Sequence, residues 1–178
     1  MSYFEKVRGT TRSPPRVGGW EVFWSWVGAF AGIGLVGWLE QISVQGAARA
    51  LLIGSFGATA VLVYGAVRSP LAQPRNVIGG HVLSALVGVA CQQLLHPWPP
   101  IAAAAAVATA IALMHLTRTL HPPGGATALI AVIGGPKVHA LGFGYALIPV
   151  ALGAVLLVAV GVLVNNLPQS RRYPEFWV

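Results

Sequence analysis

The segment GATAVL at residues 57–62 recurs almost unchanged as GATALI at residues 125–130. Each copy is preceded by an apolar stretch and a basic residue, Arg49 or Arg118, and is followed by a second, glycine-containing apolar stretch. One such pair can arise by chance in a chain rich in alanine and glycine, but the agreement of the flanking stretches argues against chance. The repeated unit is therefore a long apolar segment, a GATA segment and another long apolar segment.

The charged residues around these segments are few and widely spaced. The chain is 56% hydrophobic and 8% charged, whereas soluble domains carry about 25% charged residues. The intervals 21–40, 49–68 and 118–137 each hold 18 uncharged residues between charged ends, and about 20 apolar residues cross a bilayer as helix. The chain is therefore expected to be an integral membrane protein that crosses the bilayer several times.

The longest uncharged stretch must contain a turn. Between Arg75 and Arg118 lie 42 uncharged residues, which would extend roughly 63 Å as one helix, about twice the apolar thickness of a bilayer. The run HPWPP at residues 96–100 removes backbone donors and places an indole at interface depth. We expect one span to end before this run and the next to begin after it.

Two copies of a three-crossing unit must have opposite orientations, because three is an odd number. We therefore expect an all-α membrane protein with about six membrane elements, arranged as two inverted three-element repeats with broken helices at the GATA segments. Transporters built in this way hold substrate near the bilayer midplane. The expected organisation is a basic cytoplasmic tail (1–19), one membrane domain (20–167, with repeats 20–95 and 100–167) and a C-terminal tail (168–178).

The basic residues test this topology. With the N-terminus inside and six crossings, only Arg49 and Lys137 lie outside, and nine basic residues lie on the cytoplasmic side. If residues 119–136 re-enter without crossing, eight basic residues lie on the cytoplasmic side and three lie outside. Both satisfy the positive-inside rule, so full crossing and re-entry stay open. The cytoplasmic residues in the first scheme are Lys6, Arg8, Arg12, Arg16, Arg68, Arg75, Arg118, Arg171 and Arg172.

The second GATA segment begins with the run TLHPPGG at 119–125. Paired prolines and glycines disfavour a helix, so we expect the helix to begin near Gly125 or Ala126, well inside the membrane. Free N–H groups at a helix start attract an anion without any basic side chain. Alternatively, the glycines are simply small residues that allow the helices to pack closely. The predicted anion-binding residues of the two segments are Ser55, Gly57, Ala58 and Thr59 in the first, and His121, Pro122, Pro123, Gly124, Gly125, Ala126 and Thr127 in the second.

Four further residues are expected around this site: Arg75, Asn76, His81 and Arg118. The arginines would attract anions to the mouth or act only as topology anchors. His81 would line a pore or hydrogen-bond between helices, and His121 would relay protons or cap backbone carbonyls.

Other chemistry has little support. The histidines lack metal-ligand spacing, the chain has no aspartate, and its four glutamates lie outside or at the ends of the spans. We expect no enzymatic activity, no cofactor and no metal. A haem or metal enzyme using His81, His115 and His121 would have a visible absorption band or bound metal.

Two strings point to a family. HPPGGATAL at 121–129 and PLAQPRNVIGGH at 70–81 resemble the HPP family of small integral membrane proteins, over roughly residues 20–164. That resemblance implies four or five helices, and it implies transport of nitrite or a similar small anion, because members include nitrite transporters of cyanobacterial and chloroplast membranes.

The expected function is transport of a small inorganic anion, most directly nitrite, and the alternative is a ligand-binding or regulatory membrane subunit. Expected partners are the lipid bilayer, the anion and further copies of the chain in a dimer or trimer, with no nucleic acid. The absence of a transit-peptide pattern favours a bacterial inner membrane.

Overall fold

The structure is a computed structural model that describes residues 2–7, 11–42 and 53–178. Within these ranges all regular structure is helical. The helices are α1 (Tyr3–Val7), α2 (Gly19–Ile42), α3 (Gly54–Ala60), η2 (Val61–Gly65), η3 (Pro70–Ala72), α4 (Pro74–Leu95), α5 (Pro99–Leu116), α6 (Pro122–Ile133), α7 (Gly135–His139), η4 (Gly142–Ala146), η5 (Leu147–Ala151) and α8 (Leu152–Asn165).

Four of these helices are long and apolar enough to cross a membrane. They are α2, α4, α5 and the run Gly142–Asn165 that ends in α8. Gly54–Gly65, which joins α3 to η2, and Pro122–Ile133, which is α6, are shorter apolar helices. At about 1.5 Å per residue, the 12 residues of α6 extend only ~18 Å. The expected order of long, short and long apolar elements is present twice, and the inverted relation of the two halves stays a prediction.

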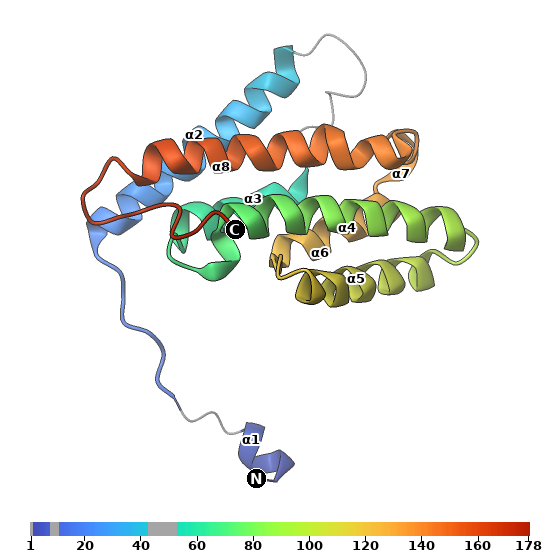
Figure 1. The fold of residues 1–178 in the computed structure, drawn as a ribbon, viewed down its shortest axis with the longest axis horizontal. Helices are drawn as coiled ribbons and strands as arrows, with labels where there is room; N and C mark the ends of the chain where they lie inside the picture. Colours follow the sequence, from blue (N-terminus) through green and yellow to red (C-terminus); the bar gives the residue numbers. More distant parts are fainter. Residues whose placement is uncertain (1, 8–10, 43–52) are drawn as a thin grey trace.

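Helix α4 lies at the centre of the bundle. It packs against α5 and α6 on one side and also contacts α8, which packs against α2. Figure 1 shows α4, α5 and α8 with similarly directed axes, while α2 crosses them obliquely. In the same view α3 leads toward the end of the bundle where α4 begins, and α6 leads toward the end where α4 finishes.

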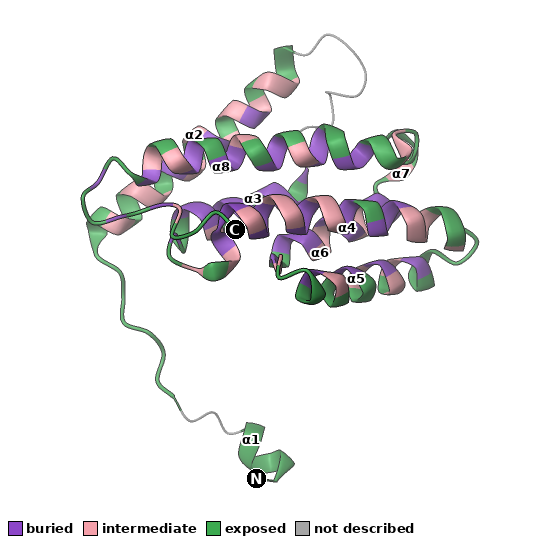
Figure 2. Ribbon diagram, viewed as in Figure 1, coloured by how far each residue is buried: buried purple, intermediate pink, exposed green. Residues whose placement is uncertain are grey.

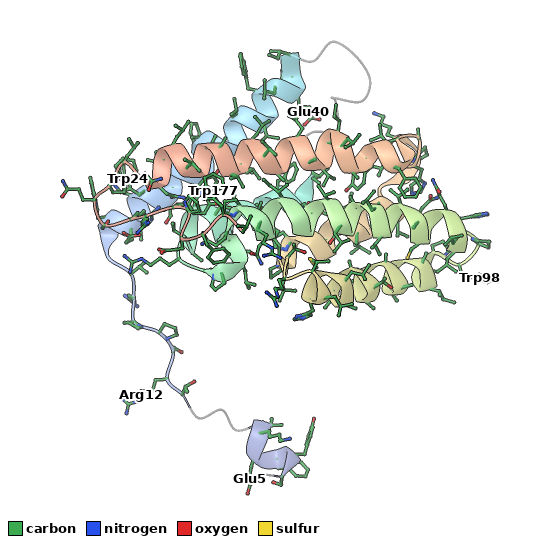
Figure 3. All side chains as sticks on the ribbon, viewed as in Figure 1. Glu5, Arg12, Trp24, Glu40, Trp98 and Trp177 are labelled. Atoms are coloured by element: carbon green, nitrogen blue, oxygen red, sulfur yellow. The ribbon has the colours of Figure 1, made fainter. Side chains whose placement is uncertain are left out.

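The outer surface of the bundle is apolar, as expected for contact with lipid. Figure 2 shows the buried residues on the inner faces of α4, α6 and α8, whereas α2 exposes the aromatic side chains of Trp20, Trp26, Phe30 and Trp38. Trp24 and Trp98 lie toward opposite ends of the bundle (Figure 3). Tryptophans at both ends are typical of the two membrane interfaces.

The predicted turn between the third and fourth long segments is confirmed. Helix α4 ends at Leu95 and α5 begins at Pro99, so the turn lies within the HPWPP run. The predicted first and last spans are confirmed as helices Gly19–Ile42 and Gly142–Asn165. Arg8 and Arg49, which entered the charge count, lie outside the described residues.

The predicted start of α6 is wrong. The helix begins at Pro122, with prolines in its first two positions, and not near Gly125 or Ala126. A proline in the first turn costs no hydrogen bond, because the N–H groups there have no partner within the helix. The paired prolines therefore start this helix and do not interrupt it.

Small residues allow α4 and α6 to cross closely. A Cβ atom on Gly80 would lie 2.7 Å from His121 Cβ and 2.7 Å from the Thr119 oxygen, and one on Gly124 would lie 2.7 Å from Ser84 Oγ. Glycines 28 and 32 of α2 make room for the ring of Tyr64 in the same way. The packing interpretation of these small residues is therefore confirmed.

Candidate functional site

A cluster of polar side chains lies buried where α3, α4 and α6 meet. Helix α3 contributes Ser55 and Thr59, α4 contributes His81, and α6 contributes Thr127 together with His121, the residue that precedes its first turn. All five side chains are at most 1% exposed. These five residues are called the hydroxyl–imidazole cluster below, and both GATA segments take part in it.

His81 is the centre of this cluster. Its Nε2 atom lies 2.7 Å from Thr59 Oγ1, and its Nδ1 atom lies 2.7 Å from Thr127 Oγ1. One imidazole ring thus joins the equivalent threonines of the two GATA segments. The interhelical hydrogen-bonding role considered for His81 is present in the structure.

His121 occupies the other end of the cluster. Its Nε2 atom lies 3.0 Å from Thr59 Oγ1, and its Nδ1 atom donates to the backbone oxygen of Leu71 at 2.8 Å. The rings of His121 and His81 are 4.8 Å apart between centroids. His121 therefore caps a backbone carbonyl and also contacts the cluster, so both roles considered for it remain compatible with its position.

Each threonine also contacts the preceding turn of its own helix. Thr59 Oγ1 donates to the backbone oxygen of Ser55 at 3.2 Å, and Thr127 Oγ1 donates to the backbone oxygen of Pro123 at 3.3 Å. Thr127 Oγ1 also lies 2.8 Å from Ser55 Oγ, a second acceptor within reach of its single hydroxyl proton. The two GATA segments hence make the same local bond, and a direct contact between α3 and α6 connects them.

Apolar and aromatic groups enclose the cluster. The Phe56 ring lies edge-on to His81 with centroids 5.4 Å apart. Tyr145, in η4, donates its hydroxyl proton to the backbone oxygen of Thr127 at 3.3 Å. Because water is kept away from the cluster, its hydrogen bonds act at low dielectric and an unpaired polar group would be costly.

The local sequence explains how His121 reaches this place. A residue before proline avoids helical geometry, and His121 is extended, with φ −141° and ψ 104°. Its side chain therefore leaves the start of α6 toward α4, where Gly80 makes room for its Cβ atom.

The backbone of α6 does not offer the free N–H groups expected there. Pro122 and Pro123 have no N–H, and the N–H of Gly124 donates to the backbone oxygen of His121 at 2.8 Å. In α3 the N–H of Phe56 donates to the backbone oxygen of Ile53. The polar groups that converge are side chains of the hydroxyl–imidazole cluster, so an anion site here would be built mainly from hydroxyl and imidazole donors.

Several predicted site residues point away from the cluster. Gly57 and Ala58 are exposed on α3. Gly125 and Ala126 line an apolar cavity of about 530 Å³ between α5 and α6, together with Pro122, which is exposed. Pro123 and Gly124 are buried in the first turn of α6. The structure therefore brings together the threonines and the serine of the GATA segments, but not their glycines and alanines.

The predicted flanking residues hold the loop that leads into α6. Arg75 donates to the backbone oxygen of Thr117 at 2.9 Å, and Asn76 donates to the backbone oxygen of Leu120 at 2.9 Å. Arg118 is exposed and has a positive φ of 57° in the turn after α5. Arg75 and Asn76 thus fix the 117–120 segment just before His121, and none of the three contacts the cluster in the described bonds.

The remaining histidine proposed for metal chemistry lies elsewhere. His115 is exposed in the last turn of α5, whereas His81 and His121 are buried. Within the part of the chain that the structure describes, no group of three or more histidine, cysteine, aspartate or glutamate side chains could hold a metal ion.

Sequence reasoning missed a second polar assembly, at Arg171. Its guanidinium donates to Glu21, Ser25, the backbone oxygen of Tyr64 and Asn165 through five hydrogen bonds. The arginine side chain is only 3% exposed and its Nε lies 2.8 Å from the Glu21 carboxylate. Only the charge of Arg171 was visible in the sequence, because its partners are spread over more than a hundred positions of the chain.

The helices, the apolar outer surface and the buried polar cluster define an integral membrane protein with several membrane-crossing helices and two short helices that meet inside the bundle. Residues 14–174 match the family of HPP transmembrane regions. The chain belongs to this family, as the two sequence strings indicated.

Two curated proteins of Dictyostelium discoideum, each described as a transmembrane protein, are similar over almost the whole chain. One is 42% identical over 180 residues, covering 99% of this chain and 58% of its own length. The other is 40% identical over 182 residues, covering 99% of this chain and 64% of its own length. The chain thus spans about three fifths of the length of these relatives. No solved structure matches it.

Proposed function

We propose that this protein carries a small inorganic anion, most directly nitrite, across the membrane, with the hydroxyl–imidazole cluster as its binding site. The observation that carries this proposal is the burial of five polar side chains, drawn from both GATA segments and from α4, inside a bundle with an apolar outer surface. Ionisable side chains inside a membrane domain are costly and mark transport pathways in many membrane proteins.

The chemistry of the cluster suits a small oxyanion. Hydroxyl and imidazole N–H groups donate hydrogen bonds to oxygen, and at low dielectric such bonds to a charged acceptor are strong. The chain contains no aspartate, and its glutamates are at positions 5, 21, 40 and 175, none of them in α3, α4 or α6. A cluster rich in donors and without carboxylates favours anions over cations.

The closed state of the cluster favours a carrier over an open channel. Its side chains bond to one another and are at most 1% exposed, so an anion must separate them before it can bind. The opposite courses of α3 and α6 along α4 (Figure 1) are those expected of inverted halves, whose relative movement opens a central site to each side in turn.

The test is uptake of nitrite by vesicles that contain the purified protein. We expect uptake well above that of protein-free vesicles, and we expect Thr127→Val to reduce it at least tenfold, because this change removes a hydroxyl from the cluster. Thr109→Val is the matched control, since Thr109 is exposed on α5, and it should leave uptake unchanged.

Equal uptake in protein-containing and protein-free vesicles would refute transport of nitrite, provided that a known transporter works in the same preparation. Thermal stabilisation of the protein by nitrite without uptake would instead support a ligand-binding or regulatory subunit.

A further inference from the structure

Two adjoining cavities lie at the end of the bundle where α2 begins and the C-terminal segment, residues 166–178, packs. One cavity, of about 470 Å³, is bounded by the first turn of α2, residues 65–69, and the C-terminal segment. The other, of about 600 Å³, lies between Arg68 and the C-terminal segment. Arg68, Ser170 and Arg171 line both cavities. The two cavities together are called the arginine pocket below, and they share no residue with the hydroxyl–imidazole cluster.

Arg171 forms one wall of the arginine pocket, and its charge is already compensated. Its Nε atom lies 2.8 Å from one carboxylate oxygen of Glu21, and the other oxygen accepts from the Ser170 hydroxyl at 3.1 Å. The guanidinium donates five hydrogen bonds within the protein, as many as it has N–H groups. The Arg171–Glu21 pair therefore shapes the pocket and leaves no charge for a ligand.

Arg68 and Arg172 supply the positive charge that remains. Both side chains are exposed. Among the bonds between described residues, Arg68 makes one, to the backbone oxygen of Ser170 at 3.1 Å, and Arg172 makes none. Glu175 lines the same cavity as these two arginines. Two guanidinium groups thus stand against one carboxylate, and the pocket keeps an excess of positive charge.

Aromatic side chains place the pocket at the depth of the lipid headgroups. Trp20, Phe23 and Trp24 of α2 pack against one another, with ring centroids between 5.5 and 5.7 Å apart, and the first two are exposed. Aromatic rings of this kind gather at the membrane–water interface. Glu21 lies between them in the sequence and lines the pocket. The pocket therefore opens at the level where lipid phosphates are concentrated.

We propose that the arginine pocket binds the headgroup of an anionic glycerophospholipid, with its phosphate held by Arg68 and Arg172 and its acyl chains along the apolar outer surface of the bundle. Guanidinium groups donate paired hydrogen bonds to phosphate oxygens, and basic pockets between membrane helices take anionic headgroups. A free inorganic anion of a few atoms fills little of a pocket this large. The inference is independent of the proposed transport.

The experiment measures lipid binding to the purified protein in detergent, by native mass spectrometry and by the midpoint of thermal unfolding. Dioctanoyl phosphatidylglycerol is the anionic probe, and dioctanoyl phosphatidylcholine is the zwitterionic probe with the same chains. Inorganic phosphate supplies the anion without chains. We expect phosphatidylglycerol to raise the midpoint and to bind at least about tenfold more tightly than phosphatidylcholine. Inorganic phosphate at the same concentration should leave the midpoint unchanged.

Arg172→Gln is the sharpest variant, because Arg172 makes no bond to another described residue. It should weaken binding of phosphatidylglycerol roughly fivefold, the effect of one arginine beside an anionic headgroup. Arg68→Gln should weaken binding at least as much, and it also removes the bond to Ser170. If that variant does not fold, Arg172→Gln alone decides the test. Arg12→Gln is the matched control: it removes the same charge from an exposed segment away from the bundle (Figure 3), so binding should change less than about twofold.

Hydrogen exchange locates the bound lipid. Phosphatidylglycerol should slow exchange in residues 65–69 and 169–172, and it should leave residues 135–139 at the other end of the bundle unchanged. Protection confined to other segments would refute a headgroup site in the arginine pocket.

Three results would overturn the proposal. Equal binding of the two lipids would show that the headgroup charge is not recognised. An equal effect of inorganic phosphate would show a site for free anions. A loss in Arg12→Gln as large as that in Arg172→Gln would show general attraction to a basic chain. Nitrite uptake plays no part in these measurements, so this inference and the proposed function stand or fail separately.

Discussion

His81 depends on two hydroxyl groups that come from different parts of the chain. Both ring nitrogens lie 2.7 Å from a threonine oxygen, one in α3 and one in α6, and the ring is fully buried. A buried polar group that loses its partner costs about 1–3 kcal/mol, because no water replaces the bond. The threonines should therefore matter for stability as well as for binding.

Thr127→Val is expected to lower the free energy of unfolding by about 1–3 kcal/mol, because His81 Nδ1 and Ser55 Oγ each lose a partner. Thr109→Val, on the exposed face of α5, should change it by no more than about 0.5 kcal/mol. Thermal unfolding in detergent measures both. Equal stability of the two variants would show that the bonds of Thr127 do not hold the bundle together.

At this scale the sequence predicted some of the cluster and missed its connections. The repeat identified Thr59 and Thr127, and the intramembrane positions identified His81 and His121. Nothing in the sequence pairs His81 with both threonines, because these contacts depend on how closely α4 and α6 cross. The backbone oxygen of Leu71 has no sequence signal at all, because every residue has the same backbone carbonyl group whatever its side chain.

Among the helices, the crossing of α4 and α6 sets the geometry of the hydroxyl–imidazole cluster. Both helices contribute to it, and they approach closely at Gly80, Gly88 and Gly124. A Cβ atom on Gly88 would lie 2.6 Å from the Ala128 oxygen and 2.7 Å from Ala131 Cβ. Neither neighbour can rotate away, because the Ala128 oxygen belongs to the backbone and the Ala131 Cβ atom is attached directly to it.

Gly88→Ala is expected to destabilise the bundle by about 1–3 kcal/mol, because α4 and α6 must separate to admit the methyl group. Gly34→Ala is the matched control: a Cβ atom there meets nothing within 4 Å, so the change should be neutral or stabilising by up to about 1 kcal/mol. The midpoint of thermal unfolding compares the two. A Gly88→Ala protein as stable as the wild type would contradict the close crossing.

The elements themselves were largely predictable. Long gaps between charges located α2, α5 and α8, and the prolines of the HPWPP run located the turn after α4. The start of α6 was misplaced because proline was treated only as a helix breaker, although it is favourable in the first turn. The length of α3 could not be inferred, since the interval between Arg49 and Arg68 suggested a full crossing.

The whole molecule is closed at one end by its C-terminal segment, residues 166–178. Arg171 ties this segment to α2, η2 and α8, and Tyr173 donates to the backbone oxygen of Ala72 at 2.9 Å. In Figure 1 the start of α4, the end of α5 and the C-terminal segment lie toward this end of the bundle, and α7 lies at the other. Arginines 68, 75, 118 and 171 are in or next to the first group of segments, and Lys137 is in α7. This separation agrees with the charge distribution used for topology, while the side that faces the cytoplasm stays a prediction.

Arg171→Lys should loosen the C-terminal segment, because lysine keeps the charge but cannot make five hydrogen bonds in a fork. We expect hydrogen exchange of residues 166–178 to become at least about tenfold faster, which corresponds to the loss of roughly 1.4 kcal/mol or more from hydrogen bonds to a charged group. Arg172→Lys, at an exposed position, is the control. Unchanged exchange in the Arg171 variant would mean that the segment is held mainly by Tyr173.

Sequence reasoning at this scale predicted two halves, whose inverted relation stays a prediction, and treated residues 168–178 as a separate tail. The structure packs this segment against the bundle, because the buried guanidinium of Arg171 finds acceptors from three helical elements at once. A charge count cannot reveal such an arrangement, since it records only that an arginine is present near the end of a span.

The short turn at residues 70–73 is held from two sides. His121 donates to the backbone oxygen of Leu71 from within the bundle, while Tyr173 and the backbone N–H of Glu175 bind the next two residues, Ala72 and Gln73, from the C-terminal segment. The turn therefore connects the C-terminal segment to the buried His121 through three consecutive residues. We expect a displacement of the C-terminal segment to move this turn and, with it, the backbone oxygen to which the His121 ring is bonded.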